Sequence, residues 1–139
     1  MTETKSSIAI LGAGSIGVAF AILFARQRFA VSVYDPIPEA LPRAKADLAE
    51  RLRQLDDAGQ LADGCRQVAE RVRFTTDMPD ALAAATLVQE CAPERVELKQ
   101  ELLRDAGVHT DRDVPLVSST SAIVPVSYTH LTLPTILRV

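Results

Sequence analysis

Short apolar runs alternate along the chain with longer stretches whose apolar residues recur at helical spacing. Five such runs predict buried strands, at residues 7–11, 30–34, 72–75, 86–91 and 114–119. The periodic stretches between them predict helices over residues 16–28, 77–85 and 94–106. Pro93 suits the first position of the last helix, and Gly107 is expected to close it. Strands that alternate with helices favour a parallel sheet covered on both faces, the doubly wound α/β fold.

Residues 37–71 predict a helical hairpin between the second and third strands. Leu41, Leu48 and Leu55 are spaced by seven and form one apolar stripe of a long helix. Gly59 is expected to end this helix, and a shorter helix through Val68 follows it. We call this insertion the helical arm.

The region from residue 6 to residue 25 contains no charged residue and is long enough to cross a membrane. Gly12, Gly14 and Gly17 interrupt it, whereas an export signal or a membrane helix needs an unbroken apolar stretch. A strand followed by a turn and a helix explains the same residues. We therefore expect no membrane segment.

Composition and charge narrow the range of functions. A chain of 139 residues with 47% apolar and 24% charged residues is typical of one soluble globular domain. The net charge of −3 and the lack of a basic block argue against a nucleic-acid partner. Cys65 and Cys91 are far apart and have no histidine near them, so we expect no metal site and a reducing, cytoplasmic location.

Residues 12–17 read GAGSIG and match the pattern G-x-G-x-x-G between a predicted strand and a predicted helix. In that context the glycines allow a tight turn, a close approach of backbone to a pyrophosphate and close packing of helix on sheet. Asp35 ends the second strand, where a carboxylate accepts hydrogen bonds from an adenosine ribose and repels a 2′-phosphate. The pattern predicts NAD as the cofactor; the alternative for an aspartate before proline is a turn former.

Two further segments resemble a known family. Residues 88–99, VQECAPERVELK, are similar to the QE-x-x-PE-x-x-x-LK segment of the 3-hydroxyacyl-CoA dehydrogenase family. Residues 118–121, SSTS, resemble its serine-rich segment, and the helical arm has a counterpart there. The residues of these two segments are most similar to the branch of the family that contains lambda-crystallin and carnitine 3-dehydrogenase. The resemblance covers residues 7–125 and implies a Rossmann-type NAD-binding domain.

The resemblance implies NAD-dependent oxidation of the 3-hydroxyl of a small hydroxy acid or a 3-hydroxyacyl-CoA. Ser121 would position the substrate hydroxyl, although a serine after a strand is also a common turn or cap residue. Glu94 and Lys99 would contact NAD near the nicotinamide ribose, the alternative being a solvated helix face. The implied cofactor-binding set is Gly12, Gly14, Ser15, Ile16, Gly17, Asp35, Glu94 and Lys99.

The resemblance also implies parts that have no counterpart in these residues. The family's general base is a histidine beyond the serine, and neither His109 nor His130 matches its segment. The C-terminal helical domain, through which the family enzymes form homodimers, is likewise expected to be absent. Residues 126–139 show no period and predict an irregular, non-native tail. We therefore expect NAD binding without useful turnover.

The prediction of the substrate class depends on two positions of the helical arm. Counting from Asp35, the arm positions that contact coenzyme A in the family hold Arg51 and Ala58. This favours a small free 3-hydroxy acid over an acyl-CoA. An NAD-sensing module without catalysis is the alternative from another functional class, and it would not need Glu94, Lys99 or Ser121.

Overall fold

The computed structural model describes residues 5–119 and 137–138, and it contains the predicted parallel sheet. The strands lie in the order β3-β2-β1-β4-β5-β6, and every pairing is parallel. Their bounds are β1 Lys5–Leu11, β2 Phe29–Tyr34, β3 Val72–Thr75, β4 Ala85–Glu90, β5 Leu116–Ser118 and β6 Leu137–Arg138. The doubly wound α/β fold is thereby confirmed.

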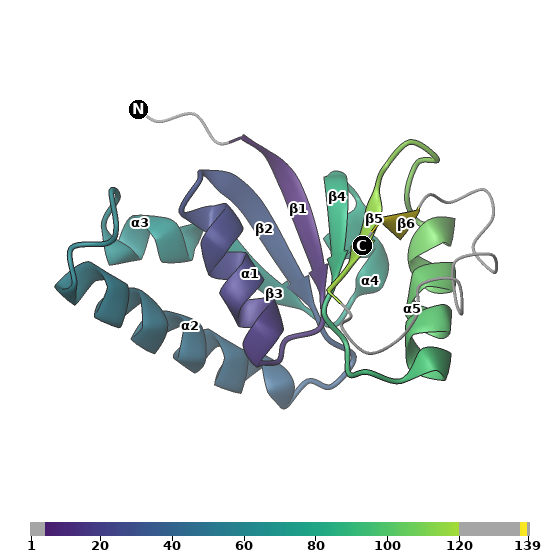
Figure 1. The fold of residues 1–139 in the computed structure, drawn as a ribbon, viewed down its shortest axis with the longest axis horizontal. Helices are drawn as coiled ribbons and strands as arrows, with labels where there is room; N and C mark the ends of the chain where they lie inside the picture. The colour runs from purple at the N-terminus through teal and green to yellow at the C-terminus, as the bar shows by residue number, and fades with distance from the viewer. Residues whose placement is uncertain (1–4, 120–136, 139) are drawn as a thin grey trace.

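Helices cover both faces of the sheet (Figure 1). On one face lie α1 (Ser15–Ala25), α2 (Ala40–Asp57) and α3 (Cys65–Glu70), and on the other lie α4 (Met78–Leu82) and α5 (Val96–Val108). The pair α2 and α3 is the predicted helical arm, and it packs along the outside of α1.

The central strand β1 explains the uncharged run near the N-terminus. Ile8 and Ile10 pack toward α1 and α2, whereas Ala9 and Leu11 pack toward α4 and α5. All four side chains are at most 3% exposed. A strand buried on both faces needs apolar residues at every position, not at alternate ones. No described helix is long and apolar enough to span a bilayer.

Several predicted helix boundaries are wrong, including the end of α4, which stops at Leu82 because Ala85 already begins β4. Helix α1 ends at Ala25, because the chain turns at Arg28, whose φ is +70°. Helix α5 begins at Val96, because Arg95 donates its N–H to the Pro93 carbonyl at 2.7 Å and turns the chain before the helix.

The end of α5 also differs from the prediction. The helix passes through Gly107 to Val108, and His109 then donates its backbone N–H to the Ala106 carbonyl. The Thr110 hydroxyl donates to the same carbonyl at 3.0 Å. These two hydrogen bonds satisfy the Ala106 carbonyl, one of the free carbonyls of the last turn, without a glycine beyond the helix.

The tail is not wholly irregular. Leu137 and Arg138 form β6, which pairs with Leu116 and Val117 of β5. A strand of two residues needs only the free backbone groups of an edge strand, so no side-chain period marks it. Whether the tail is native stays a prediction.

Candidate functional site

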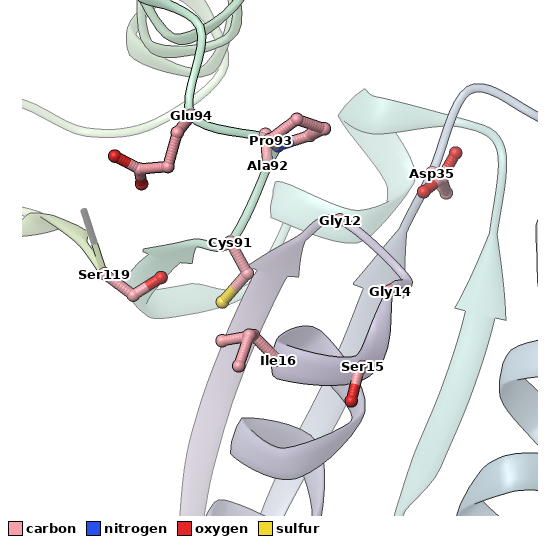
Figure 2. Close-up of a pocket in the computed structure, with 10 residues that line it drawn as sticks. All are labelled: Gly12, Gly14, Ser15, Ile16, Asp35, Cys91, Ala92, Pro93, Glu94 and Ser119. Carbon is pink, nitrogen blue, oxygen red and sulfur yellow. The ribbon is translucent and has the colours of Figure 1, made fainter. Parts of the chain in front are cut away.

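The candidate site lies where the strand order reverses, between the carboxyl ends of β1 and β4. In open α/β sheets this is where ligands bind, because the loops after the two strands run to opposite faces. A cavity of about 490 Å³ opens there, within the range of small-molecule sites. Figure 2 shows the residues that line it: Gly12, Gly14, Ser15, Ile16, Asp35, Cys91, Ala92, Pro93, Glu94 and Ser119.

The three glycines of the turn have different surroundings. Gly12 has φ +119°, and a Cβ there would lie 2.9 Å from the Cys91 carbonyl oxygen. A Cβ at Gly17 would lie 1.9 Å from the Gly12 carbonyl oxygen, so the helix could not pack on the turn. Nothing lies within 4 Å of a Cβ built at Gly14, which lines the cavity. Gly12 and Gly17 are required by the fold, whereas Gly14 leaves space for a ligand.

Asp35 accepts hydrogen bonds from the protein backbone and also lines the cavity. Its Oδ2 accepts the Ala13 N–H and its Oδ1 accepts the Ile37 N–H, both at 3.0 Å. The bond to Ile37 is the turn-forming role that was the alternative reading of this residue. Each carboxylate oxygen has a second acceptor site, so Asp35 can also accept hydroxyl donors from the cavity.

Helix α1 begins at the cavity and has no side-chain cap. Gly14 is its N-cap residue, and no side chain accepts a hydrogen bond from the first turn. Unpaired N–H groups and the positive end of the helix dipole favour an anion at this position. Ser15 and Ile16 follow in the first turn and line the cavity, and the Ile16 side chain is 55% exposed.

The helical arm contacts this helix end through Arg51. Its guanidinium donates to the Ser15 carbonyl at 3.1 Å and to the Ser15 hydroxyl oxygen at 2.7 Å. Asp47, one turn earlier on α2, pairs with the same guanidinium at 2.9 Å. The arm is therefore attached to the rim of the cavity at the first residue of α1.

The far end of the cavity is formed by the loop after β4 and the end of β5. Figure 2 shows Asp35 at one end and Glu94 with Ser119 at the other, separated by the glycine turn. The Ser119 hydroxyl donates to the Glu90 backbone carbonyl at 3.0 Å. The Glu94 side chain is 39% exposed.

Lys99 is not among the residues that line the cavity. Its side chain is fully buried, and its Nζ lies 2.8 and 2.7 Å from the two carboxylate oxygens of Glu90. Glu90 itself is fully buried, and Glu94 lies at 3.6 Å from the same Nζ. The alternative of a solvated helix face is wrong for Lys99.

Cys91 lies in the wall of the cavity with a thiol that stays protonated. Burial, followed by the charge of Glu90, raises the pKa of Cys91 to about 11, although the Ser119 hydroxyl opposes the shift. A thiolate is the nucleophilic form of cysteine, and almost none forms at neutral pH. Cys91 therefore shapes the cavity and is not a nucleophile.

Neither the predicted catalytic serine nor a histidine lies in the described part of the site. Ser121 and His130 lie outside the described residues. His109 is exposed and follows the last residue of α5, whose thirteen residues separate it by about 20 Å from the end of the helix nearest the cavity. His109 cannot reach a substrate bound there.

The sequence prediction missed Glu90 and Ser119 as site residues. Glu90 ends a largely buried strand, and Lys99 follows in the second turn of the predicted helix. An acidic residue at the end of a buried strand needs a partner, and that requirement is the signal that could have found the pair.

Comparison with known proteins agrees with this geometry. Residues 7–132 match the family described as 3-hydroxyacyl-CoA dehydrogenase, NAD binding domain. The chain is 32% identical over 126 residues to the lambda-crystallin homolog of Bos taurus, covering 89% of this chain and 39% of that protein. It is 35% identical over 119 residues to L-carnitine dehydrogenase of Streptomyces griseus, and the match covers 86% of this chain and 35% of that protein.

A solved structure gives the same result. The 3-hydroxybutyryl-CoA dehydrogenase of Escherichia coli superposes with a TM-score of 0.81 at 33% identity, over 88% of this chain and 26% of that one. The chain thus spans about two fifths or less of the length of these relatives. From the glycine turn, the strand order and the match over residues 7–132, the chain belongs to the 3-hydroxyacyl-CoA dehydrogenase family and forms its NAD-binding domain, with NAD as its cofactor.

Proposed function

We propose that the cavity holds NAD in an extended pose and that the chain supplies the cofactor half of a dehydrogenase. Asp35 would hold the adenosine ribose, and the first turn of α1 beside Gly14 would hold the pyrophosphate. The nicotinamide half would then lie toward Glu94 and Ser119. The observation that carries the proposal is the open space around Gly14. A Cβ at this position would meet nothing, so the protein's own packing does not require a glycine there.

The chain's residues would bind and orient the cofactor, and NAD when bound supplies the hydride acceptor. The α1 N-terminus would offset the pyrophosphate charge, and the carboxylate of Asp35 would discriminate against a 2′-phosphate. The protonated Cys91 and the exposed face of Ile16 would give the cavity wall an apolar surface. Ser121 stays our prediction for the residue that positions the substrate hydroxyl.

For the substrate, we propose a small free 3-hydroxy acid, oxidised at its hydroxyl-bearing carbon, in preference to an acyl-CoA. In support, the arm position where the family places a coenzyme A contact holds Arg51, and its guanidinium is bound to Ser15 and Asp47. We also propose that a histidine outside the described residues accepts the proton of the substrate hydroxyl. The complete enzyme is proposed to be a homodimer and to be located in the cytoplasm.

Cofactor choice tests the site directly. The purified chain, titrated with NAD and with NADP, should bind NAD more tightly because Asp35 repels the 2′-phosphate. Asp35→Ala should narrow the difference by ~1–3 kcal/mol, the usual effect of leaving polar partners unpaired. Asp113→Ala removes an exposed carboxylate before β5 and is the matched control, with the parent preference expected. Equal affinities of the parent for the two cofactors would contradict the proposed site.

Turnover separates the proposal from an NAD-sensing module. We expect little NADH production when the chain is mixed with NAD and L-gulonate, carnitine or 3-hydroxybutyryl-CoA, followed by near-ultraviolet absorbance. Addition of a complete relative's C-terminal region to the chain should restore turnover, with a free acid preferred. An extended protein that binds NAD and oxidises none of the three substrates would favour the sensing module.

A further inference from the structure

A second cavity lies near the amino ends of the strands, at the opposite edge of the sheet from the cofactor cavity. Its volume is about 490 Å³, which is within the range of small-molecule sites. Among the described residues, none lines both cavities. The residues of its lining that matter below are Ser7, Ala30, Ser32, Arg73, Asp80 and Ala81. The second cavity is therefore a separate feature of the fold.

Small side chains leave this space open between the sheet and α4. On β2, Val31 and Val33 pack toward α1 and α2, so that Ala30 and Ser32 point to the face that α4 covers. Helix α4 has only five residues, and it presents Ala81 to the cavity. Methyl and hydroxymethyl groups are too short to fill the gap between a helix and a sheet. A ligand with a carbon skeleton can occupy it.

The hydroxyl of Ser32 supplies a buried polar group without a partner. Ser32 is only 4% exposed and lines the cavity, and its hydroxyl makes no hydrogen bond to any of the described residues. Buried hydroxyls are normally hydrogen-bonded, and leaving one without a partner is costly. A ligand that exchanges a hydrogen bond with Ser32 would remove that cost.

The charges around the cavity are already neutralised. Each charged residue of the lining is in an ion pair: Arg73 with Asp80 at 2.6 Å, Arg71 with Asp63 at 2.6 Å, and Glu70 with Arg66 at 3.4 Å. A charged ligand would have to break one of these pairs or remain unpaired. Arg73 and Asp80 are about half exposed, and a guanidinium and a carboxylate both keep further donor and acceptor positions when paired. The cavity thus favours an uncharged ligand that both donates and accepts hydrogen bonds.

We propose that this cavity binds a small uncharged polyol, of the size of a monosaccharide or a sugar alcohol. One ligand hydroxyl bonds to Ser32, and others reach the pair of Arg73 and Asp80. The C–H groups of the ligand pack on the methyl groups of Ala30 and Ala81. This site is distinct from the proposed NAD site, and its occupation does not require the cofactor.

The first test needs no ligand. Ser32→Ala should leave the free energy of unfolding unchanged or raise it, because it removes a buried hydroxyl that has no partner. Urea denaturation measures the change. A lower free energy of unfolding in Ser32→Ala would show that the hydroxyl is already hydrogen-bonded, by the protein or by a trapped water molecule, and would overturn the proposal.

The second test titrates the chain with glucose and with xylitol and follows the backbone amide signals by NMR. The signals of Ser32 and Ala81 should shift with both probes, with Kd in the millimolar range, while that of Gly14 stays in place. Ser32→Ala should weaken binding by about fivefold. Ser6→Ala makes the same change at an exposed position of β1 and should leave Kd unchanged. No shift with either probe, or shifts only near Gly14, would overturn the proposal.

The third test changes the charge of the probe and of the cavity. Glucosamine and glucuronate are the cationic and anionic analogues of glucose, and the parent chain should bind both more weakly than glucose. Arg73→Met leaves the carboxylate of Asp80 unpaired and should strengthen glucosamine binding by about fivefold, whereas Asp80→Asn should do the same for glucuronate. A parent chain that prefers a charged sugar, or variants that keep the parent order of affinities, would overturn the proposal.

Discussion

At the scale of single residues, one motif contains glycines that are needed for different physical reasons. Gly12 and Gly17 have backbone oxygens where a Cβ would lie, whereas Gly14 has open space. The pattern G-x-G-x-x-G marks all three positions equally, and only the surroundings of each Cβ separate folding from ligand binding. This difference can be measured.

Substitution of the glycines should give opposite results. Gly14→Val should abolish NAD binding with little change in the circular dichroism spectrum, because its side chain enters only the cavity. Gly17→Val should prevent folding, since its Cβ would collide with the Gly12 carbonyl. Isothermal titration and thermal unfolding check the two outcomes. Retained NAD binding in Gly14→Val would mean that the turn is only structural.

The thiol of Cys91 predicts a loss of stability at high pH. Its folded-state pKa of about 11 lies above the unfolded value of 9.0, so the folded chain keeps a proton that the unfolded chain loses. The stabilisation is complete below pH 9 and is lost as the pH rises from 9 to about 11, by up to about 2 kcal/mol.

Urea unfolding of the parent and of Cys91→Ala at several pH values measures this effect. The difference in the free energy of unfolding between them should shrink through that interval. The comparison cancels the contribution of Tyr34, whose pKa is raised by burial and by Asp35. A difference independent of pH would show that the thiol titrates normally.

At the scale of elements, the strands were predictable and the helix ends were not. Strands such as β1 are continuous apolar runs because they are buried on both faces, and that pattern is visible in the sequence. The start of α5 depends on a hydrogen bond between Arg95 and Pro93 and on the carboxylate of Glu90 binding Ala92. Each of these is a single hydrogen bond between residues two positions apart, and a single bond of this kind leaves no period in the sequence.

The same limit applies to the candidate site. The glycine turn, Asp35 and Glu94 were predicted by motif and resemblance, and the structure brings them into one cavity. The burial of Lys99 could not be predicted, because an amphipathic helix pattern gives a lysine to the solvent unless a partner is known. The partner, Glu90, is contributed by another element.

The β4–α5 junction predicts a non-additive effect on stability. Lys99→Met should lower the free energy of unfolding by about 3–5 kcal/mol, because it leaves the charge of Glu90 buried without its partner. Glu90→Leu should cost a similar amount. The double variant should lose less than either single variant, and chemical denaturation of the four proteins completes the cycle. Additive losses would contradict a direct ionic coupling.

At the scale of the whole molecule, the order of the strands in the sheet determines where the cofactor cavity lies. It lies between β1 and β4, and its walls come from segments on both sides of that pairing. The site therefore exists only in the folded chain. Ligand binding and folding must be coupled.

NAD should accordingly stabilise the chain against heat. At a free concentration of about one hundred times Kd, binding to the folded state alone adds about 2.7 kcal/mol to the free energy of unfolding. Differential scanning calorimetry should show the melting temperature rise with NAD concentration, and a smaller rise with NADP. The Asp35→Ala variant should lose the difference. No shift at saturating NAD would argue against binding in this cavity.

The pairing of β1 with β4 has a kinetic consequence. It joins Ser7 to Ala85, so that a long loop containing the arm and β3 must close first. Contacts between residues far apart in the chain form late in folding. The cavity is therefore not yet formed in the transition state of folding, and NAD cannot bind to that state. The cofactor should slow unfolding and leave the folding rate unchanged. Bound NAD would then prolong the life of the folded chain without helping it to form.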